Sequence, residues 1–221
     1  MGTLLMRIVA PLQSWGIQSN FTVRDTGLEP SKSGMIGLVC AAMGIPRDAS
    51  LDDLNHLKMG VRIDREGIVK RDFHIVQDVL LGKGKGTKDS IITNRYYLAD
   101  AAFLVGLEGD FDLLKQIHNA LKKPVWQLYF GRKAFVPALP VWLLDGLRET
   151  EPLEESIQTY PWIVEWTPEK IPAYVRVVIE ASDGEQLRND VPLSFAKRKF
   201  IGRRVNTKMI STKQISREVV P

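Results

Sequence analysis

The chain of 221 residues predicts an α+β fold, and three features of its sequence support that prediction. Short runs of strand formers alternate with two helical patterns, and the order strand, helix, strand occurs twice before residue 149. A basic, glycine-rich segment at about residues 71–97 separates the two units. Strand patterns predominate after residue 149. We therefore expect a large domain over residues 1–148 and a small, mostly β, basic subdomain over residues 149–221.

The first unit contains a strand, a long connection and a buried helix. Residues Leu4–Val9 are apolar apart from Arg7 and predict the strand. Ser31 is a good N-cap for the helix, and Gly44 suits the left-handed residue that ends it. The residues between them leave no polar stripe, so the helix should be buried on most sides. A second short strand, Met59–Ile63, completes the unit.

The segment between the two units predicts a long β-hairpin. Residues His74–Leu81 and Ile91–Tyr97 are rich in strand formers, and glycine alternates with lysine between them. This alternation lacks the spacing of a Walker nucleotide-binding loop, and no strand leads into a helix here. We interpret the middle of the segment as a flexible basic tip that could follow a polyanion. A solvated loop that is basic for solubility is the alternative.

The second unit begins with a strand at Ala101–Leu107. The helix after it starts at Gly109-Asp110, has one apolar face and stops at Pro124, and Val125–Phe130 then predicts the closing strand. This order, β-α-β-β-α-β, is the ferredoxin-like arrangement that RNA recognition motifs also use, here with the hairpin inserted between its halves. The strand at 101–107 lacks the aromatic signature of an RNA recognition motif, so RNA should not lie across the sheet face.

The acidic, proline-bearing segment Glu149–Glu155 predicts the boundary to the C-terminal part. Beyond it, Tyr174–Glu180 alternates as a strand with one apolar face. The tail at residues 191–217 carries many lysines and arginines and no acidic residue. The C-terminal part should therefore be rich in strands and positively charged.

The composition is that of a folded protein, with 44% hydrophobic and 25% charged residues. The net charge of +4 favours anionic partners. Cys40 is the only cysteine, so it forms no internal disulfide, and a lone thiol makes no metal site; this suits a reducing compartment. The sequence shows no signal peptide and no apolar helix long enough to span a bilayer, and we expect a cytoplasmic protein without membrane contact.

The start of the first helix predicts an anion site. Ser31, Lys32 and Ser33 place two hydroxyls and an ammonium beside backbone N–H groups that have no partner within the helix. Phosphate is the usual ligand of such a helix end. The alternative is a capped core helix with a stray lysine.

Basic residues recur in clusters at the helix start, along the hairpin, after the second helix and in the tail. They include Lys32, Lys83, Lys85, Lys88, Arg95, Arg132, Lys133, Arg203 and Arg204. Such clusters could follow the phosphates of a single-stranded nucleic acid while aromatic rings stack on its bases. Candidate rings are those of Trp15, Phe21, Tyr96, Tyr97 and Tyr129. All of them could equally belong to the core, which is the better interpretation for Phe21 and Tyr129.

The sequence offers little for catalysis. The three histidines are scattered without metal-ligand spacing, and we expect neither a metal nor a cofactor. His74, together with Lys70 and Tyr96, could in principle serve metal-free RNA cleavage, which needs a general base and a general acid. A hydrogen-bonded structural histidine is the alternative.

Short motifs of the first 134 residues resemble one known family, in the order in which that family carries them. They are Leu4–Gly16, Arg24–Thr26, Pro30–Leu38, Gly44–Arg47, Arg71–His74, Arg95–Leu98, Lys123–Pro124 and Tyr129–Ala134. The sequence is similar to the CasD-type subunits of the type I-E CRISPR surveillance complex, Cascade, which are repeat-associated mysterious proteins. A weaker match follows in residues 191–195 and at Arg203-Arg204.

The resemblance implies a non-catalytic RNA-binding subunit that holds the 5′ handle of the CRISPR RNA and helps the complex to assemble. The hairpin would be a thumb that crosses the guide beside a neighbouring backbone subunit. The implied partners are this RNA and the backbone, large and small subunits, with target DNA reached only through the complex. A metal-independent endoribonuclease that cleaves the CRISPR repeat is the alternative function.

The resemblance also implies roles for individual residues. Ser31, Lys32 and Ser33 would hold handle phosphates, and Arg95 on the returning thumb strand would contact the RNA. The matching motifs place four more side chains near the handle: Gln13, Arg24, Arg132 and Lys133. Charge alone suggests RNA contacts for Lys83, Lys85, Lys88, Arg203 and Arg204.

Overall fold

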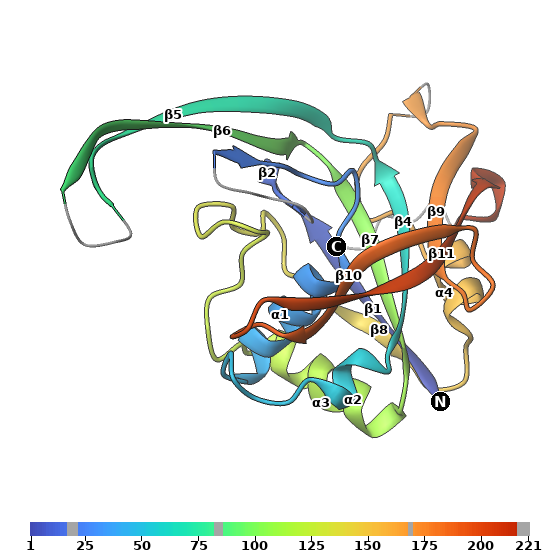
Figure 1. Ribbon diagram of the computed structural model, residues 1–221. Helices are drawn as coiled ribbons and strands as arrows, with labels where there is room; N and C mark the ends of the chain where they lie inside the picture. Colours follow the sequence, from blue (N-terminus) through green and yellow to red (C-terminus); the bar gives the residue numbers. More distant parts are fainter. Residues whose placement is uncertain (17–21, 82–85, 168–169, 216–221) are drawn as a thin grey trace.

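The computed structural model describes residues 1–16, 22–81, 86–167 and 170–215. Its main feature is a seven-stranded sheet with the strand order β10-β11-β9-β4-β7-β1-β8 (Figure 1). Helices cover parts of both faces, which confirms the predicted mixed α+β class. No helix of the described segments is long and apolar enough to cross a bilayer.

Four strands form the half of the sheet that ends at β8: β4 (Lys58–Arg65), β7 (Ala102–Gly109), β1 (Gly2–Val9) and β8 (Trp142–Arg148). Neighbouring strands in this half are antiparallel. The connection from β1 to β4 contains α1 (Lys32–Met43) and the short α2 (Asp52–Asn55), and α3 (Phe111–Lys122) joins β7 to β8. Both predicted long helices are thus present, and so are the strands predicted at Leu4–Val9, Met59–Ile63 and Ala101–Leu107.

The predicted strand at Val125–Phe130 is wrong, and β8 takes the closing place instead. Although these residues have strand-forming side chains, their backbone N–H groups cap the C-terminal end of α1. The N–H groups of Val125 and Trp126 donate to the carbonyls of Ala42 and Ala41, in the last turn of α1, at 2.9 and 3.0 Å. Those carbonyls have no partner within the helix, so this tertiary contact outweighs strand propensity.

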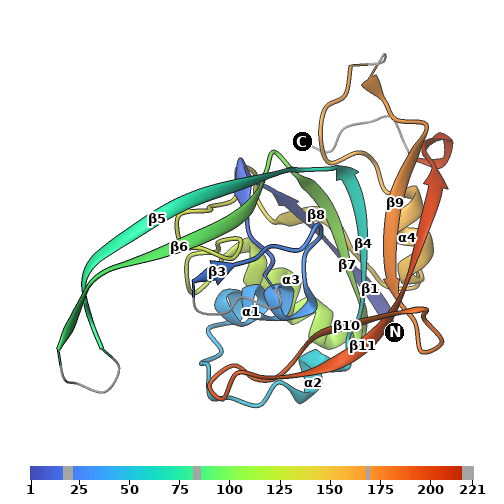
Figure 2. The same cartoon turned by 45° about the horizontal axis from the view of Figure 1, so that its top comes forward.

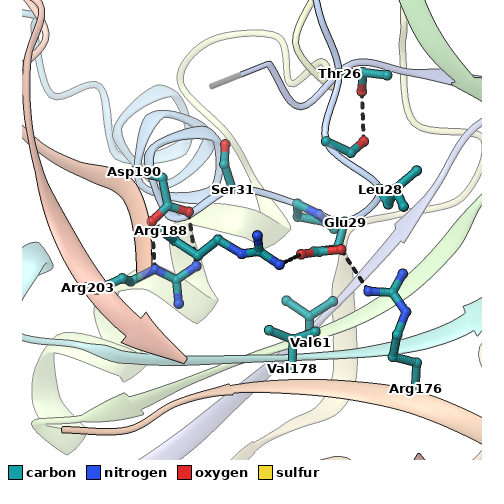
Figure 3. Close-up of a pocket in the computed structure, with 12 residues that line it drawn as sticks. Thr26, Leu28, Glu29, Ser31, Val61, Arg176, Val178, Arg188, Asp190 and Arg203 are labelled. Atoms are coloured by element: carbon teal, nitrogen blue, oxygen red, sulfur yellow. Dashed lines mark hydrogen bonds and ion pairs between the residues drawn. The ribbon is translucent and has the colours of Figure 1, made fainter. Parts of the chain in front are cut away.

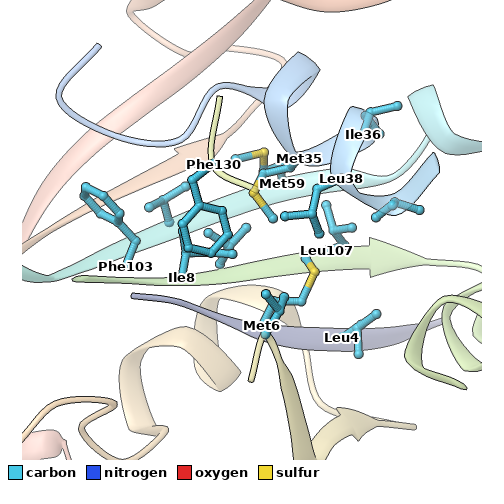
Figure 4. Close-up of a cluster of buried hydrophobic side chains, with 14 of the residues drawn as sticks. Leu4, Met6, Ile8, Met35, Ile36, Leu38, Met59, Phe103, Leu107 and Phe130 are labelled. Carbon is cyan, nitrogen blue, oxygen red and sulfur yellow. The ribbon is translucent and has the colours of Figure 1, made fainter. Parts of the chain in front are cut away.

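The core lies on both faces of the sheet, and β1 shows how one strand serves both. Leu4, Met6 and Ile8 point into the cluster between the sheet, α1 and α3 (Figure 4). Leu5 and Val9 point to the opposite face, where they pack with α4 (Leu153–Thr159). Side chains alternate along a strand, so a strand buried on both faces is apolar at nearly every position.

The strands after residue 149 extend the same sheet. β9 (Tyr174–Glu180) has the predicted bounds and pairs with β4, while β11 (Lys199–Ser211) pairs with β9 and with β10 (Gln186–Ser194). A single 3-10 turn, Thr212–Gln214, follows. The C-terminal part is rich in strands, and one continuous sheet joins it to the first part of the chain.

The long hairpin, called the thumb from here on, is present and projects from the body as a curved arm (Figures 1 and 2). Its strands, β5 (Ile68–Leu80) and β6 (Thr87–Ala99), are longer than the predicted flanking runs. At the base of the arm, β6 also pairs with β2 (Leu12–Gln13) and β3 (Val23–Arg24), both from the long connection after β1. The predicted flexible tip falls largely at residues 82–85, outside the described segments.

Candidate nucleic-acid interface

The start of α1 does not offer the open anion site that the sequence suggested. Ser31 caps the helix by accepting a hydrogen bond from the Gly34 N–H at 3.3 Å. The N–H of Lys32 donates to Oδ2 of Asp190 at 2.8 Å, so the protein's own carboxylate occupies this helix end. The ammonium of Lys32 donates to both carboxylate oxygens of Glu180 at 3.0 Å and to the carbonyl of Asn55 at 3.1 Å.

The structure therefore does not present Lys32 as an open phosphate contact. Its side chain is almost fully buried, with 1% of the residue exposed. Burial lowers the pKa of its ammonium, and the charge and hydrogen bond of Glu180 act in the opposite direction. A buried lysine needs such a partner because an unpaired ammonium in the interior is costly. Lys32 is thus a structural cation.

The same network uses one of the tail arginines. The guanidinium of Arg203 donates to Asp190 at 2.7 and 3.0 Å and lies 3.5 Å from Glu180. Its charge is likewise buried and paired, so the structure does not present Arg203 as an open RNA contact. Arg204 is exposed and donates to the carbonyl of Gly184 at 3.0 Å.

A cavity of about 280 Å³ lies beside this network (Figure 3). Carboxylates in its lining neutralise the charges of its arginines. Glu29 lies between two guanidiniums and binds that of Arg176 at 2.8 Å and that of Arg188 at 3.2 Å. Arg176 also pairs with Glu66 at 3.1 Å. These ion pairs join the connection before α1 to β9 and β10, so the cavity offers an anion little uncompensated charge.

A second cavity, of about 510 Å³, brings together five of the predicted site residues. Arg24, Arg95 and Arg132 line it, together with the hydroxyl-bearing Ser31 and Ser33. Among the described residues, no acidic side chain lines it. The rest of its lining comes from segments that the sequence did not single out as one site: Ser14, Trp15, Gly16, Gly34, Gly131, Phe195 and Phe200. We call this cavity the arginine cleft.

Two of the three arginines come from paired strands. Arg24 on β3 lies opposite Arg95 on β6 in the parallel register, so the two start from adjacent backbone positions. The Nε of Arg95 donates to the hydroxyl of Thr93 at 3.1 Å. This bond orients the guanidinium without neutralising its charge.

The third arginine is placed by a tight turn after α3. Gly131 has φ of +88°, and a side chain there would overlap the carbonyl of Ser14. The Ser14 N–H donates to the carbonyl of Phe130 at 3.1 Å, which fixes the turn against the loop after β2. Arg132 then reaches the cleft and donates to the carbonyl of Tyr96 at 3.4 Å. Only glycine takes this conformation at such a close approach without strain.

The electrostatics of the cleft favour an anion. Burial is the main cause that lowers the pKa of Arg132, and repulsion from Arg95 and Arg24 lowers it further, while Asp72 and Tyr97 raise it. None of the three guanidiniums is ion-paired with a carboxylate of the described residues. Asp72, opposite Arg95 in the hairpin, is the acidic group that acts on Arg132. Three guanidiniums close together with so little compensation can be stabilised by a bound phosphate, which a guanidinium fork fits well.

The remaining predicted residues lie in different places. Gln13 is fully buried: its amide donates to the carbonyl of Ala101 at 2.8 Å and accepts from the indole of Trp15 at 3.0 Å, so the structure does not present it as an open handle contact. Lys133 is exposed beside the cleft, and Lys88 is exposed on the thumb. Lys83, Lys85 and the aromatic Phe21 lie outside the described residues.

The proposed cleavage set is not assembled by the thumb. In the register of the hairpin, Lys70 pairs with Tyr97 and His74 with Thr93, whereas Tyr96 pairs with Arg71. Because successive side chains point to opposite faces of a strand, Tyr96 lies on the other face of the ribbon from Lys70 and His74. Among the residues that the structure describes, no three histidine, cysteine or acidic side chains gather as a metal site would require.

Comparisons with known proteins agree on one family. The family described as "CRISPR-associated protein (Cas_Cas5)" matches residues 3–206. The chain is 32% identical over 155 residues to the "CRISPR system Cascade subunit CasD" of Escherichia coli (strain K12), an alignment that covers 63% of this chain and 69% of that protein.

Two solved structures share the fold over nearly the whole chain. One, described as "Crystal structure of Cas protein", has a TM-score of 0.81 and 40% identity, and 98% of each chain is covered. A chain of a "CRISPR RNA-guided surveillance complex" has a TM-score of 0.79 and 34% identity, covering 98% of this chain and 93% of that one. The chain therefore belongs to the Cas5 family of CRISPR-associated proteins.

Proposed function

We propose that this protein is the non-catalytic subunit of a type I-E Cascade complex that binds the 5′ handle of the CRISPR RNA. It would work in the cytoplasm with the backbone, large and small subunits, and would meet target DNA only through the complex. The family and the name of the relative from E. coli support this assignment. So does the match to a chain of an RNA-guided complex.

The observation that carries the proposal is the arginine cleft. Arg24, Arg95 and Arg132 converge on one cavity whose lining, among the described residues, contains no acidic side chain. Burial, and then repulsion from Arg95 and Arg24, lower the pKa of Arg132. Contacts of this kind fix the position of a nucleic acid through its phosphates, while base pairing elsewhere reads the sequence. The cleft thus takes the place of Lys32 as the phosphate site.

The shape of the chain fits the rest of the proposal. We assign β1-α1-β4-β7-α3-β8 to the ferredoxin-like arrangement, because its strand order and its two helical connections follow that pattern. The thumb projects from this unit between β4 and β7, and its strand β6 carries Arg95 at the base. RNA held in the cleft would therefore leave along the thumb.

The test is RNA binding by purified protein. The probe is fluorescein-labelled RNA with the repeat sequence of the protein's own CRISPR array, measured by anisotropy over a series of salt concentrations. Arg95→Gln should weaken binding and reduce the slope of log K against log salt by about one, as expected for one lost phosphate contact. Arg65→Gln is the control, because Arg65 lies outside the cleft and donates to the carbonyl of Asp100. Equal affinities and slopes for Arg95→Gln and wild type would contradict the proposal.

The same RNA separates binding from cleavage. We expect the protein to leave the repeat intact, because the thumb holds Tyr96 on the opposite face from Lys70 and His74. Electrophoresis after incubation without metal is the measurement. Cleavage at one position that is lost on His74→Ala would favour the endoribonuclease.

A further inference from the structure

An apolar groove of about 490 Å³ adjoins the arginine cleft and has no role in the function proposed so far. Its volume falls within the range of roughly 300–1,000 Å³ that is typical of sites for small organic groups. Gly34, Gly37 and Ala41 line one side of it. These positions share one face of α1, and their small side chains leave the helix backbone accessible.

The opposite side of the groove is aromatic. Trp126 and Tyr129 line it, and 48% and 39% of their surfaces are exposed. The sequence suggested Tyr129 as a core residue, and the structure shows that it is not. A preformed wall of exposed rings is typical of sites at which nucleobases stack.

A backbone hydrogen bond joins two sides of the groove. The N–H of Trp126 donates to the carbonyl of Ala41 at 3.0 Å, which ties the aromatic side to the helical side. Phe195, from the turn between β10 and β11, closes a third side, and a side chain at Gly37 would meet its ring at 3.6 Å. A rigid groove of this kind binds without much ordering cost.

The charges around the groove favour an anionic chain. The groove shares Ser33, Gly34, Gly131 and Phe195 with the arginine cleft, so the two cavities are continuous. At the other side lies Arg47, whose guanidinium donates to the carbonyl of Phe195 at 3.3 Å. The exposed residues Lys197, Arg198 and Lys199 follow at the end of the turn and the start of β11, and the described lining of the groove contains no acidic residue. Cations thus flank the apolar wall on both sides.

We propose that this groove is a nucleobase subsite, in which an unpaired base of the RNA stacks on Trp126 and Tyr129 while its phosphates lie in the arginine cleft. The proposal rests on the RNA-binding function above and adds a site for a base to a site for phosphates. A neutral or basic protein segment would not use the cations on both sides, and an acidic one carries no planar bases to stack on the two rings, which is why we favour RNA as the occupant.

The experiment couples one RNA position to the two rings. A set of labelled repeat RNAs, each with a single abasic nucleotide, is titrated against wild type and against Trp126→Ala/Tyr129→Ala. On wild type we expect one or two positions at which the missing base weakens binding about tenfold, which corresponds to one lost stack. On the double variant the same abasic RNAs should bind as well as intact RNA. A positional loss of equal size in both proteins, or none in either, overturns the subsite.

Two further variants keep the result interpretable. Gly37→Leu fills the groove from a helical position where leucine is favoured over glycine, so it should fold well and lose the same tenfold. Tyr174→Ala removes an exposed ring elsewhere, on β9, and should behave as wild type. If Arg95→Gln weakens binding while Trp126→Ala/Tyr129→Ala and Gly37→Leu do not, the subsite is wrong and the function stands. If wild type does not bind the repeat RNA, both proposals fall.

One more readout distinguishes a protein occupant. If the double variant binds every RNA as wild type does but fails to copurify with co-expressed complex subunits, the groove is a protein-binding surface and the nucleobase subsite is overturned.

Discussion

At the scale of single residues, the main lesson concerns which cations are available to a ligand. Lys32 and Arg203 are buried and held by Glu180 and Asp190, whereas Arg95 lies in an open cleft, where its Nε donates to a hydroxyl and no carboxylate of the described residues forms an ion pair with it. A buried cation must be paired, so its charge is already used. Exposure and the absence of a carboxylate partner therefore identify a phosphate contact better than basicity does.

Lys32→Ala tests this distinction. We expect the free energy of unfolding to fall by about 3 kcal/mol, because Glu180 loses its closest cation while both groups are largely shielded from water. Urea denaturation measures the change. The salt dependence of RNA binding should match that of wild type, since no phosphate contact is removed. A well-folded Lys32→Ala protein with a reduced salt slope would restore the original interpretation.

Arg62 is a second buried cation, and its role is purely structural. Its guanidinium pairs with Asp64 at 2.6 and 2.9 Å and donates to the carbonyls of Ile157, Tyr160 and Pro161. Asp64 also accepts the N–H of Ile163. One buried ion pair thus satisfies the backbone where the chain leaves α4 and fixes that segment to the sheet.

Arg62→Ala should therefore lower the free energy of unfolding by about 3–5 kcal/mol, because it leaves a buried carboxylate without its cation. Chemical denaturation again provides the measurement. Arg65→Ala, at the end of the same strand, should change stability by no more than about 0.5 kcal/mol. Similar losses for the two variants would contradict the assigned role of Arg62.

At the scale of elements, close approaches at glycine position both helices and loops. A side chain at Gly106 would lie 2.5 Å from Leu153, and one at Gly60 the same distance from Ile157, so α4 packs directly on the backbone of β7 and β4. The turn at Gly131 uses the same principle to hold Arg132 beside the loop after β2. Small residues thus set the distances between elements that carry the site.

Gly131→Ala should weaken binding of the repeat RNA about as much as Arg132→Ala does. Its φ of +88° disfavours a side chain, and the new methyl group would overlap the carbonyl of Ser14, so the turn must move and displace Arg132. Gly86→Ala is the matched control: Gly86 has φ of +90°, and among the described residues a side chain there would meet only Leu81, at 3.9 Å. Anisotropy with both variants would contradict the prediction if Gly131→Ala bound as tightly as Gly86→Ala.

At the scale of the whole molecule, the thumb is an arm with little core of its own. Many of its apolar side chains are exposed, among them Ile68, Val69, Phe73, Ile75, Val76, Leu80, Leu81 and Ile92. Exposed apolar surfaces of this extent are typical of interaction sites. The body, by contrast, buries a cluster on each face of its sheet. We infer that the thumb contributes to assembly and little to the stability of the body.

A shortened thumb tests this division. Residues 76–91 are replaced by Asn-Gly, which closes a two-residue turn between the cross-strand pair Ile75 and Ile92 and leaves Arg95 in place. The thermal midpoint of unfolding should stay within a few degrees of wild type. Copurification with co-expressed complex subunits should fall strongly. An unchanged yield of complex would show that the thumb is dispensable for assembly.

The sequence could predict much of the fold because its signals are local. The apolar run of β1, the caps at Ser31 and Gly44, the amphipathic α3 and the alternation of β9 all act over a few neighbouring residues. The closing strand failed because residues 125–126 bind the end of α1, a contact that no local pattern records. The helix α4 was missed for another reason, because its acidic first turn resembled a boundary segment.

Local patterns in the sequence were enough to predict β1, β4, β7 and β9, the two long helices, the hairpin and the clusters of basic residues from which a polyanion site could be built. Which of those cations remain open depends on the folded structure. Lys32 and the Asp190 that closes its helix end are 158 residues apart, and the three arginines of the cleft come from two strands and a loop. Which charges pair depends on distances in the folded structure. Because burying an unpaired charge is costly, a cation in the interior must have a carboxylate beside it, whereas a cation at the surface need not.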